Sequence, residues 1–574
     1  MTMRALSGAL SGVVAAMFAA YSSFAAAAAQ ESADVVFING NIHTQDSAHR
    51  IVEGLALRGN SIVGLGSNAA VSEFEGPKTK KIDLQGRLML PGFIDAHVHP
   101  AESAQMADKC SLNDKAMPYA TIQTKIQQCI KQHPIKPGRW FEVVMVNPTG
   151  ATLTMGQLDK ILTAPLILEG ADGHTVWLNS AAMAAAHIDK QTKDPAGGRI
   201  EHDAGGNPSG ALRDNATLLG LSAVPAESLE EQASLLKKTL EDMHAVGITS
   251  VQDAAVDEHL MSLYKYLYDR HQLDMRVRGS FHIKDLKAPA ADILREAQAF
   301  RQHWAVDPDF LKADAVKIFA DGVIEYPSQT AALLEPYLDA AGKPTQNRGP
   351  SYFTREGLDQ IVTAIDAADF TVHIHAIGDR AVRSSLDAFE AARQHNGERD
   401  NRDQIAHLEL ISPQDFPRFK SLGVIANFQL LWAEREVYID EGTVPYLGAE
   451  RSKYLYPARS LKDAGAVIAG GSDWGVSSFD PFLAMEHGIT RAEFKGRPPL
   501  LPEQALSIAD MVDAYTANAA YALKQEKTTG SLEVGKRGDL VVVDRDIFKV
   551  DPFDLHKAQV LSTYLDGREV YSRH

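Results

Sequence analysis

The chain alternates short apolar runs with amphipathic stretches over most of its length. Stretches with helical periodicity, such as 229–247 and 355–370, lie between several of the runs. Buried parallel strands separated by amphipathic helices are typical of βα repetition. The runs number eight, which predicts an α/β fold with a (β/α)₈ TIM barrel rather than an open sheet. The eight runs are 88–99, 247–254, 275–283, 313–322, 370–379, 404–411, 423–429 and 465–473.

Both ends of the chain show a different pattern, in which short strands are broken by tight turns. Segments 34–44 and 55–67 contain Asn-Gly and Gly-Asn turns, and 530–544 and 563–571 repeat this character. We expect the two ends to meet in one small sheet domain. The alternative is two unrelated terminal hairpins, each of which would be marginally stable alone.

The segment from Pro100 to about Ala245 is much longer than one βα crossover requires. Because a loop of this length without structure is rare, we predict an inserted lobe at about 101–245, after the first barrel strand and beside the barrel mouth. The predicted domains are residues 30–90 and 526–574, the two parts of the terminal β domain, and 91–525, the barrel with its insertion.

The first 29 residues have the features of a secretory signal peptide. Arg4 is their only charge, a short apolar stretch follows, and Ala-x-Ala choices lie around Ala25 to Ala29. An uncleaved membrane anchor is the alternative. We expect a protein secreted to a bacterial periplasm, with no stable membrane association after signal removal.

The net charge of the chain limits the kinds of partner that it is expected to bind. The 574 residues carry a formal net charge of −17 and the pI is about 5.6. This charge argues against nucleic acid and anionic membrane surfaces, and leaves a small-molecule substrate as the expected partner. The sequence leaves a homo-oligomer open. Cys110 and Cys129 are read as a disulfide or as two inert thiols.

Two histidines end the first apolar run. His97 and His99 are two residues apart, so they project to the same face of a strand. At the carboxyl end of a barrel strand, that face is the active-site mouth. Two imidazoles aimed at one point are a natural start for a divalent metal site. Two satisfied polar histidines are the alternative.

Later runs also end in residues that bind metals. His375, His407 and Asp473 end three of them, and Lys317 lies inside an apolar run, where a bare ammonium would be costly to bury. Each has an ordinary alternative: a core histidine, a helix-capping aspartate, or a lysine that reaches the rim. Their recurrence at separate strand ends favours one shared site.

Several motifs resemble a known family. "PGFIDAHVHP", "VKIFADG", "HAIGDRAV", "GSDWGV" and "GSLEVGKRGDLVVVD" occur in the order found in the amidohydrolase superfamily, and are similar to its amidohydrolase 3 (YtcJ-like) branch. The resemblance covers nearly all of the chain after the signal. It implies a metal-binding (β/α)₈ barrel and a small β-sandwich built from both chain ends.

The resemblance also implies roles for individual residues. Lys317 resembles a lysine that is carboxylated and bridges two metals, and Asp473 resembles an aspartate that touches metal and moves protons. His174, in "DGHTVW", is expected as a catalytic residue that reaches in from the lobe to bind substrate or help at the oxyanion; a structural hydrogen bond beside Trp177 is the alternative. His373 and Asp321 either support the site or belong to core and turn. The implied metal ligands are His97, His99, Lys317, His375, His407 and Asp473.

The expected function is hydrolysis of a non-peptide C–N bond, of amide or N-formyl type, by water activated at a divalent metal. Zinc is the first candidate, with one or two ions per chain. One alternative is the same scaffold acting on cyclic amides or carbamates, or as a deaminase. Another is a catalytically silent exported protein that binds metal or regulates.

Overall fold

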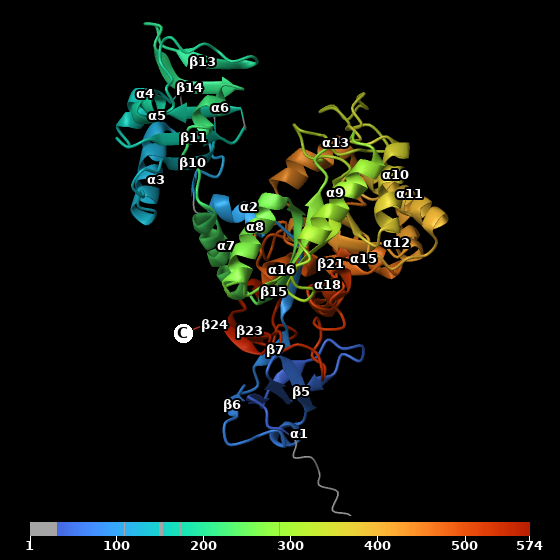
Figure 1. The fold of residues 1–574 in the computed structure, drawn as a ribbon. Helices are drawn as coiled ribbons and strands as arrows, with labels where there is room; N and C mark the ends of the chain where they lie inside the picture. The colour runs from blue at the N-terminus through green and yellow to red at the C-terminus, as the bar shows by residue number, and fades with distance from the viewer. Residues whose placement is uncertain (1–30, 108, 148–152, 173, 286, 574) are drawn as a thin grey trace, which may run out of the picture.

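The computed structural model describes residues 31–107, 109–147, 153–172, 174–285 and 287–573. Figure 1 shows a central barrel, a lobe that stands to one side of it, and a β domain at the opposite end. The expected signal peptide, residues 1–29, lies outside the described residues. No helix in the described part is long and apolar enough to cross a bilayer.

The barrel is a sheet of eight parallel strands in the order β21-β20-β19-β18-β17-β16-β15-β8. The outermost two, β21 and β8, adjoin where the Asp473 N–H donates to the His97 carbonyl at 2.7 Å. Each strand overlaps one of the eight apolar runs, so the predicted (β/α)₈ barrel is confirmed. The strands are β8 (Phe93–Val98), β15 (Ile248–Val256), β16 (Arg276–His282), β17 (Leu311–Phe319), β18 (Thr371–Ala376), β19 (Gln404–His407), β20 (Ile425–Phe428) and β21 (Ile468–Gly470).

Amphipathic helices cover the outside of the barrel. In α7 (Leu229–His244) the Ser228 hydroxyl accepts from the Glu231 N–H in a capping box that begins the helix. Its buried face has helical spacing and joins the barrel core. The others include α8 (Glu258–Asp269), α9 (Ala290–His303), α10 (Arg355–Ala367), α11 (Asp379–Asn396), α12 (Phe416–Leu422), α15 (Ala458–Asp463), α16 (Pro481–Thr490), α17 (Ile508–Ala514) and α18 (Ala517–Ala522).

The lobe follows β8 and α2 (Pro100–Ala107), as the sequence predicts. It holds a six-stranded sheet, β13-β14-β12-β11-β10-β9, with its own apolar core. Cys110 and Cys129 form a disulfide there, so the paired alternative holds. The elements are β9 (Cys110–Ser111), α3 (Tyr119–Gln132), β10 (Phe141–Val146), α4 (Met155–Asp159), β11 (Leu166–Gly170), β12 (Thr175–Leu178), α5 (Ser180–Ala185), β13 (Gly198–His202), β14 (Pro208–Asp214) and α6 (Thr217–Leu221).

Both chain ends share the remaining β domain, which confirms the predicted β-sandwich. One sheet has the order β5-β4-β1-β6 and the other β24-β23-β22-β7-β2-β3, with a common core between them. The exact boundaries at 30–90, 91–525 and 526–574 stay predictions. The elements are β1 (Val35–Ile38), β2 (Asn41–His43), β3 (Ile51–Val52), β4 (Gly54–Arg58), β5 (Ser61–Gly66), α1 (Asn68–Ser72), β6 (Lys80–Asp83), β7 (Leu88–Pro91), β22 (Leu540–Val543), β23 (Val560–Leu565) and β24 (Arg568–Ser572).

The first apolar run is divided between two domains at Gly92. β7 pairs with β22 in the β-sandwich, whereas β8 begins one residue after Gly92 and pairs with β15 in the barrel. A Cβ atom at Gly92 would lie 2.4 Å from the Thr249 Oγ1 of β15. The chain therefore crosses between the domains at a point where only glycine fits without displacing a neighbour.

Candidate metal centre

The sequence-predicted ligands meet at the carboxyl end of the barrel. His97 comes from the end of β8, and His99 follows that strand directly. Lys317 lies in β17, His375 in β18 and His407 at the end of β19, while Asp473 follows β21. Together they border one cavity of about 890 Å³. Active sites of (β/α)₈ barrels lie at this end, because the strand-end side chains and loops converge there.

A compact cluster forms the centre of this group. Ligand atoms of His97, His407 and Asp473 all lie within 4.8 Å of one another. Asp473 Oδ1 is 3.1 Å from His99 Nε2 and 3.4 Å from His97 Nε2. His407 and Asp473 have left-handed backbones, with φ of 77° and 53°. Such backbones are costly for non-glycine residues and occur often at functional sites, where the surrounding structure holds them.

Lys317 adds a nitrogen to the cluster. Its side chain is fully buried, and Nζ lies 3.4 Å from His97 Nε2. Burial lowers the pKa of Lys317 to about 7, although the nearby Asp473 carboxylate favours the charged form. A substantial fraction of this amine is therefore uncharged near neutral pH.

His375 borders the cluster from the side. Its ring centroid is 4.3 Å from that of His407, and its Nε2 lies 3.1 Å from the Gly322 carbonyl oxygen. Burial and the Lys317 charge lower the pKa of His375 to about 4. The ring is thus neutral at ordinary pH, which is the form in which imidazole binds metals.

Two further polar residues, His373 and Asp321, lie next to histidines of the cluster. His373 Nε2 lies 2.9 Å from His97 Nδ1, and His373 Nδ1 lies 2.6 Å from Gln252 Nε2. Asp321 is buried 3.7 Å from His375 Nε2 and accepts three backbone N–H groups. Of the alternatives that the sequence left open, this geometry favours the supporting role, because His373 and Asp321 lie beside His97 and His375.

His174 is not part of this arrangement. It lies in the inserted lobe, where its side chain is 73% exposed and its Nδ1 is 3.2 Å from Asp214 Oδ1. It is absent from the described residues that line the cavity. The geometry therefore does not bring His174 to the cluster, and a role for His174 in binding substrate stays a prediction.

The residues present fit a divalent metal. Neutral imidazoles and a carboxylate are the donor set that zinc and similar ions take. Among the described residues, His99 Nδ1 and His407 Nδ1 are buried without a hydrogen-bond partner. Contacts with His99, His407 and Lys317 outweigh burial and lower the pKa of Asp473, so this carboxylate is ionised and available as a ligand.

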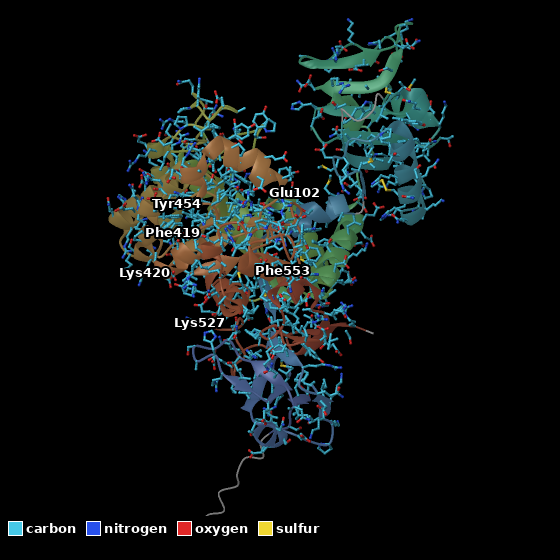
Figure 2. The ribbon with its side chains drawn as sticks, turned by 180° about the vertical axis from the view of Figure 1, so that it is seen from behind. Glu102, Phe419, Lys420, Tyr454, Lys527 and Phe553 are labelled. Carbon is cyan, nitrogen blue, oxygen red and sulfur yellow. A yellow bond between two sulfur atoms is a disulfide. The ribbon has the colours of Figure 1, made fainter. Side chains whose placement is uncertain are left out.

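A second cavity adjoins the first and reaches the lobe. Its volume is about 1020 Å³, and both cavities include His99 and Val476 in their walls. Ser111 and Met145 of the lobe face it from one side and Glu102 of α2 from the other. Glu102 is labelled in Figure 2 on the side of the barrel nearest the lobe. The lobe thus borders the approach to the cluster.

Sequence reasoning missed a set of glutamates in the same cavity. They come from loops after β17, β19 and β20, the carboxyl ends of three barrel strands. A signal was present, because Glu409 stands two residues after His407 in "HLEL" and two more acids occur in "WAERE". The four are Glu325, Glu409, Glu434 and Glu436.

Comparison with known proteins identifies the family of this chain. The model of the amidohydrolase family matches residues 80–571. The chain belongs to the amidohydrolase family. This confirms the resemblance carried by its motifs.

Individual relatives match this amidohydrolase over most of their length. The N-substituted formamide deformylase of Arthrobacter pascens is 28% identical over 566 residues, covering 94% of this chain and 98% of the relative. The protein LONG AFTER FAR-RED 3 of Arabidopsis thaliana is 29% identical over 552 residues, covering 94% and 92%. The structure of an uncharacterized metal-dependent hydrolase from Pyrococcus furiosus superposes with a TM-score of 0.71 at 21% identity, covering 90% and 100%, which shows the shared fold.

Proposed function

We propose that this amidohydrolase is a metal-dependent hydrolase that cleaves a non-peptide C–N bond of amide or N-formyl type. The observation that carries the proposal is the convergence of His97, His407 and Asp473 within 4.8 Å at the carboxyl end of the barrel. The similarity to an N-substituted formamide deformylase supports the N-formyl choice.

The cluster would hold one or two divalent ions, with zinc as the first candidate. His97, His99, His375, His407 and Asp473 would supply the donors, and a carboxylated Lys317 would add an anionic oxygen to them. Carboxylation requires an uncharged amine, which burial favours at Lys317. Bound there, the metal supplies Lewis acidity that lowers the pKa of water and polarises a carbonyl oxygen.

Asp473 is the residue that moves the proton. Its carboxylate is ionised and points into the cavity beside His99. It accepts the proton of the attacking water at a carboxylate oxygen and passes it to the leaving nitrogen. The neutral His97, held by His373, keeps its Nε2 directed at the same point.

Two alternatives share part of this evidence. A cyclic amide, a carbamate or an amine undergoing deamination would use the same donors. A catalytically silent metal-binding or regulatory protein would not need an intact proton acceptor. Asp473 is present, buried and paired with His99, which favours the hydrolase.

We also propose export to the periplasm. The Cys110–Cys129 disulfide supports it, because disulfides persist in oxidising compartments and are rare in the cytosol.

The test combines metal analysis with turnover. We expect the purified protein to hold one or two divalent ions per chain and to release formate or amine from a panel of N-formyl amines and simple amides. Asp473→Asn should lower kcat by about a thousandfold or more while the circular dichroism spectrum is unchanged. Retained activity in Asp473→Asn would remove its assigned role. A protein that takes up no metal on reconstitution would contradict the proposed function.

A further inference from the structure

The cavity around the cluster carries an excess of acidic side chains away from the cluster. Four glutamates line it: Glu325, Glu409, Glu434 and Glu436. Among its described lining residues Lys317 is the only lysine, and there is no arginine. The glutamates come from three separate loops, so the excess is a property of the assembled cavity and of no single segment.

Glu409 is the most buried of the four. Only 2% of this residue is exposed, and its side chain contacts the Tyr456 hydroxyl. Its second oxygen, Oε2, is buried without a hydrogen-bond partner among the described residues. An unpartnered carboxyl oxygen at such depth is costly unless a ligand supplies a hydrogen-bond donor or a positive charge.

Glu434 repeats this arrangement on the loop after β20. Its Oε2 is also without a hydrogen-bond partner in the described part of the chain. His487 Nδ1 is 3.5 Å away but donates to the Leu431 carbonyl at 2.8 Å. Burial lowers the pKa of His487, so its ring is neutral and supplies no countercharge. Burial and repulsion from Glu493 and Glu436 raise the pKa of Glu434 to about 8, so a cation bound beside this carboxyl would favour its ionised form.

Aromatic rings complete the walls between these carboxyl groups. Trp432 lies parallel to the His407 ring, with 5.7 Å between the centroids and 6° between the planes. Tyr326, Tyr438 and Tyr456 line the same cavity. Rings of this kind attract organic cations through their negative faces, and together with carboxylates they form the usual binding site for ammonium groups.

We infer that this cavity binds a substrate that carries a positively charged amino or quaternary ammonium group in addition to the bond that is cleaved. The inference rests on the proposed function, since it names the substrate class of that same site. The cationic group would lie between Glu409, Glu434 and Trp432, with the scissile carbonyl directed at the cluster. The aromatic walls favour an organic cation over a bare metal ion, which prefers a shell of oxygens.

The test uses two formamides of equal length, one ending in a trimethylammonium group and the other in its neutral isostere, a tert-butyl group. We expect kcat/KM to be at least about tenfold higher for the cationic formamide. In Glu434→Gln this ratio should fall about tenfold. The matched control is Glu450→Gln, because Glu450 is an exposed surface residue that pairs with Lys453. It should keep the wild-type ratio.

A binding measurement separates this inference from the proposed reaction. An alkyl trimethylammonium compound without a formyl group is titrated into the metal-loaded protein by calorimetry, with its tert-butyl isostere for comparison. Preferential binding of the cation that Glu434→Gln weakens would support the inference even if neither formamide were hydrolysed. Equal hydrolysis of both formamides, with the same ratio in Glu434→Gln, would overturn the inference and leave the reaction standing. Glu325→Gln provides a second variant if Glu434→Gln does not fold, and the metal content of each variant is measured.

Discussion

His373 is fully buried beside the cluster, where its ring contacts that of His97. The contact joins His373 Nε2 to His97 Nδ1 at 2.9 Å, which leaves His97 Nε2 directed toward Asp473. Residues that hydrogen-bond a metal-bound imidazole fix its tautomer and its orientation. His373 is therefore a positioning residue that acts through His97.

Replacing His373 with alanine should lower metal affinity without removing a ligand. We expect the metal affinity to fall by about 10- to 100-fold, as measured by competition with a chelator of known affinity. The control is His244→Ala, because His244 is also buried but its Nδ1 donates to the Ile248 carbonyl, away from the cluster. Equal metal affinity in His373→Ala and the wild type would show that His97 keeps its orientation without this contact.

At the scale of single residues, the sequence could predict contacts that depend on the spacing of residues along one strand. His97 and His99 share one strand, and period-two geometry brings them to one face. The contact between His97 and His373 joins β8 to β18 across the barrel interior, and no spacing rule encodes it. The glutamates of the cavity were missed for the same reason. Glu409 and Glu434 come from different loops, and only the closed barrel brings them to one wall.

At the scale of elements, the apolar runs located all eight barrel strands, because parallel strands buried on both faces read as continuous apolar segments. Continuous apolar segments do not, however, reveal the boundary between the β-sandwich and the barrel. β7 and β8 form one apolar run in the sequence, yet they belong to different domains. Burial patterns cannot show this division, since both strands are buried; the Pro91–Gly92 pair between them was the local signal.

The Gly92 junction gives a prediction for the barrel and the sandwich together. In Gly92→Ala the new methyl group would lie 2.4 Å from Thr249 Oγ1, so β8 or β15 must shift. We expect the free energy of unfolding to fall by about 1–3 kcal/mol, which calorimetry would detect as a lower Tm. The control is Gly156→Ala in α4, where nothing lies within 4 Å of the new methyl group and helix propensity favours alanine. A Tm in Gly92→Ala equal to that of the control would contradict the close-approach argument.

At the scale of the whole molecule, a buried ion cluster fastens the β-sandwich to the barrel. Arg276 begins β16, and Asp539 and Asp566 flank strands of the sandwich. Arg276 Nε and Nη2 donate to the two Asp539 oxygens at 2.7 and 3.1 Å, and Nη2 also pairs with Asp566. The arginine is only 2% exposed, so the chain ends are held to the barrel through a desolvated, bidentate contact.

Arg276→Met should therefore destabilise the protein strongly, because it leaves Asp539 buried without its cation. Removing one partner of a buried pair costs about 3–5 kcal/mol, whereas an exposed pair contributes about 0–1 kcal/mol.

Arg568→Met is a matched control: Arg568 also links the sandwich to the barrel, through Asp274, but its side chain is 62% exposed. We expect a large drop in Tm for Arg276→Met and almost none for Arg568→Met, and the difference should persist in high salt, because burial protects the first contact from screening. In calorimetry the sandwich of Arg276→Met should also unfold in a separate, earlier transition. Equal Tm values for the two variants would contradict the assignment of the buried ion cluster as the contact that holds the sandwich to the barrel.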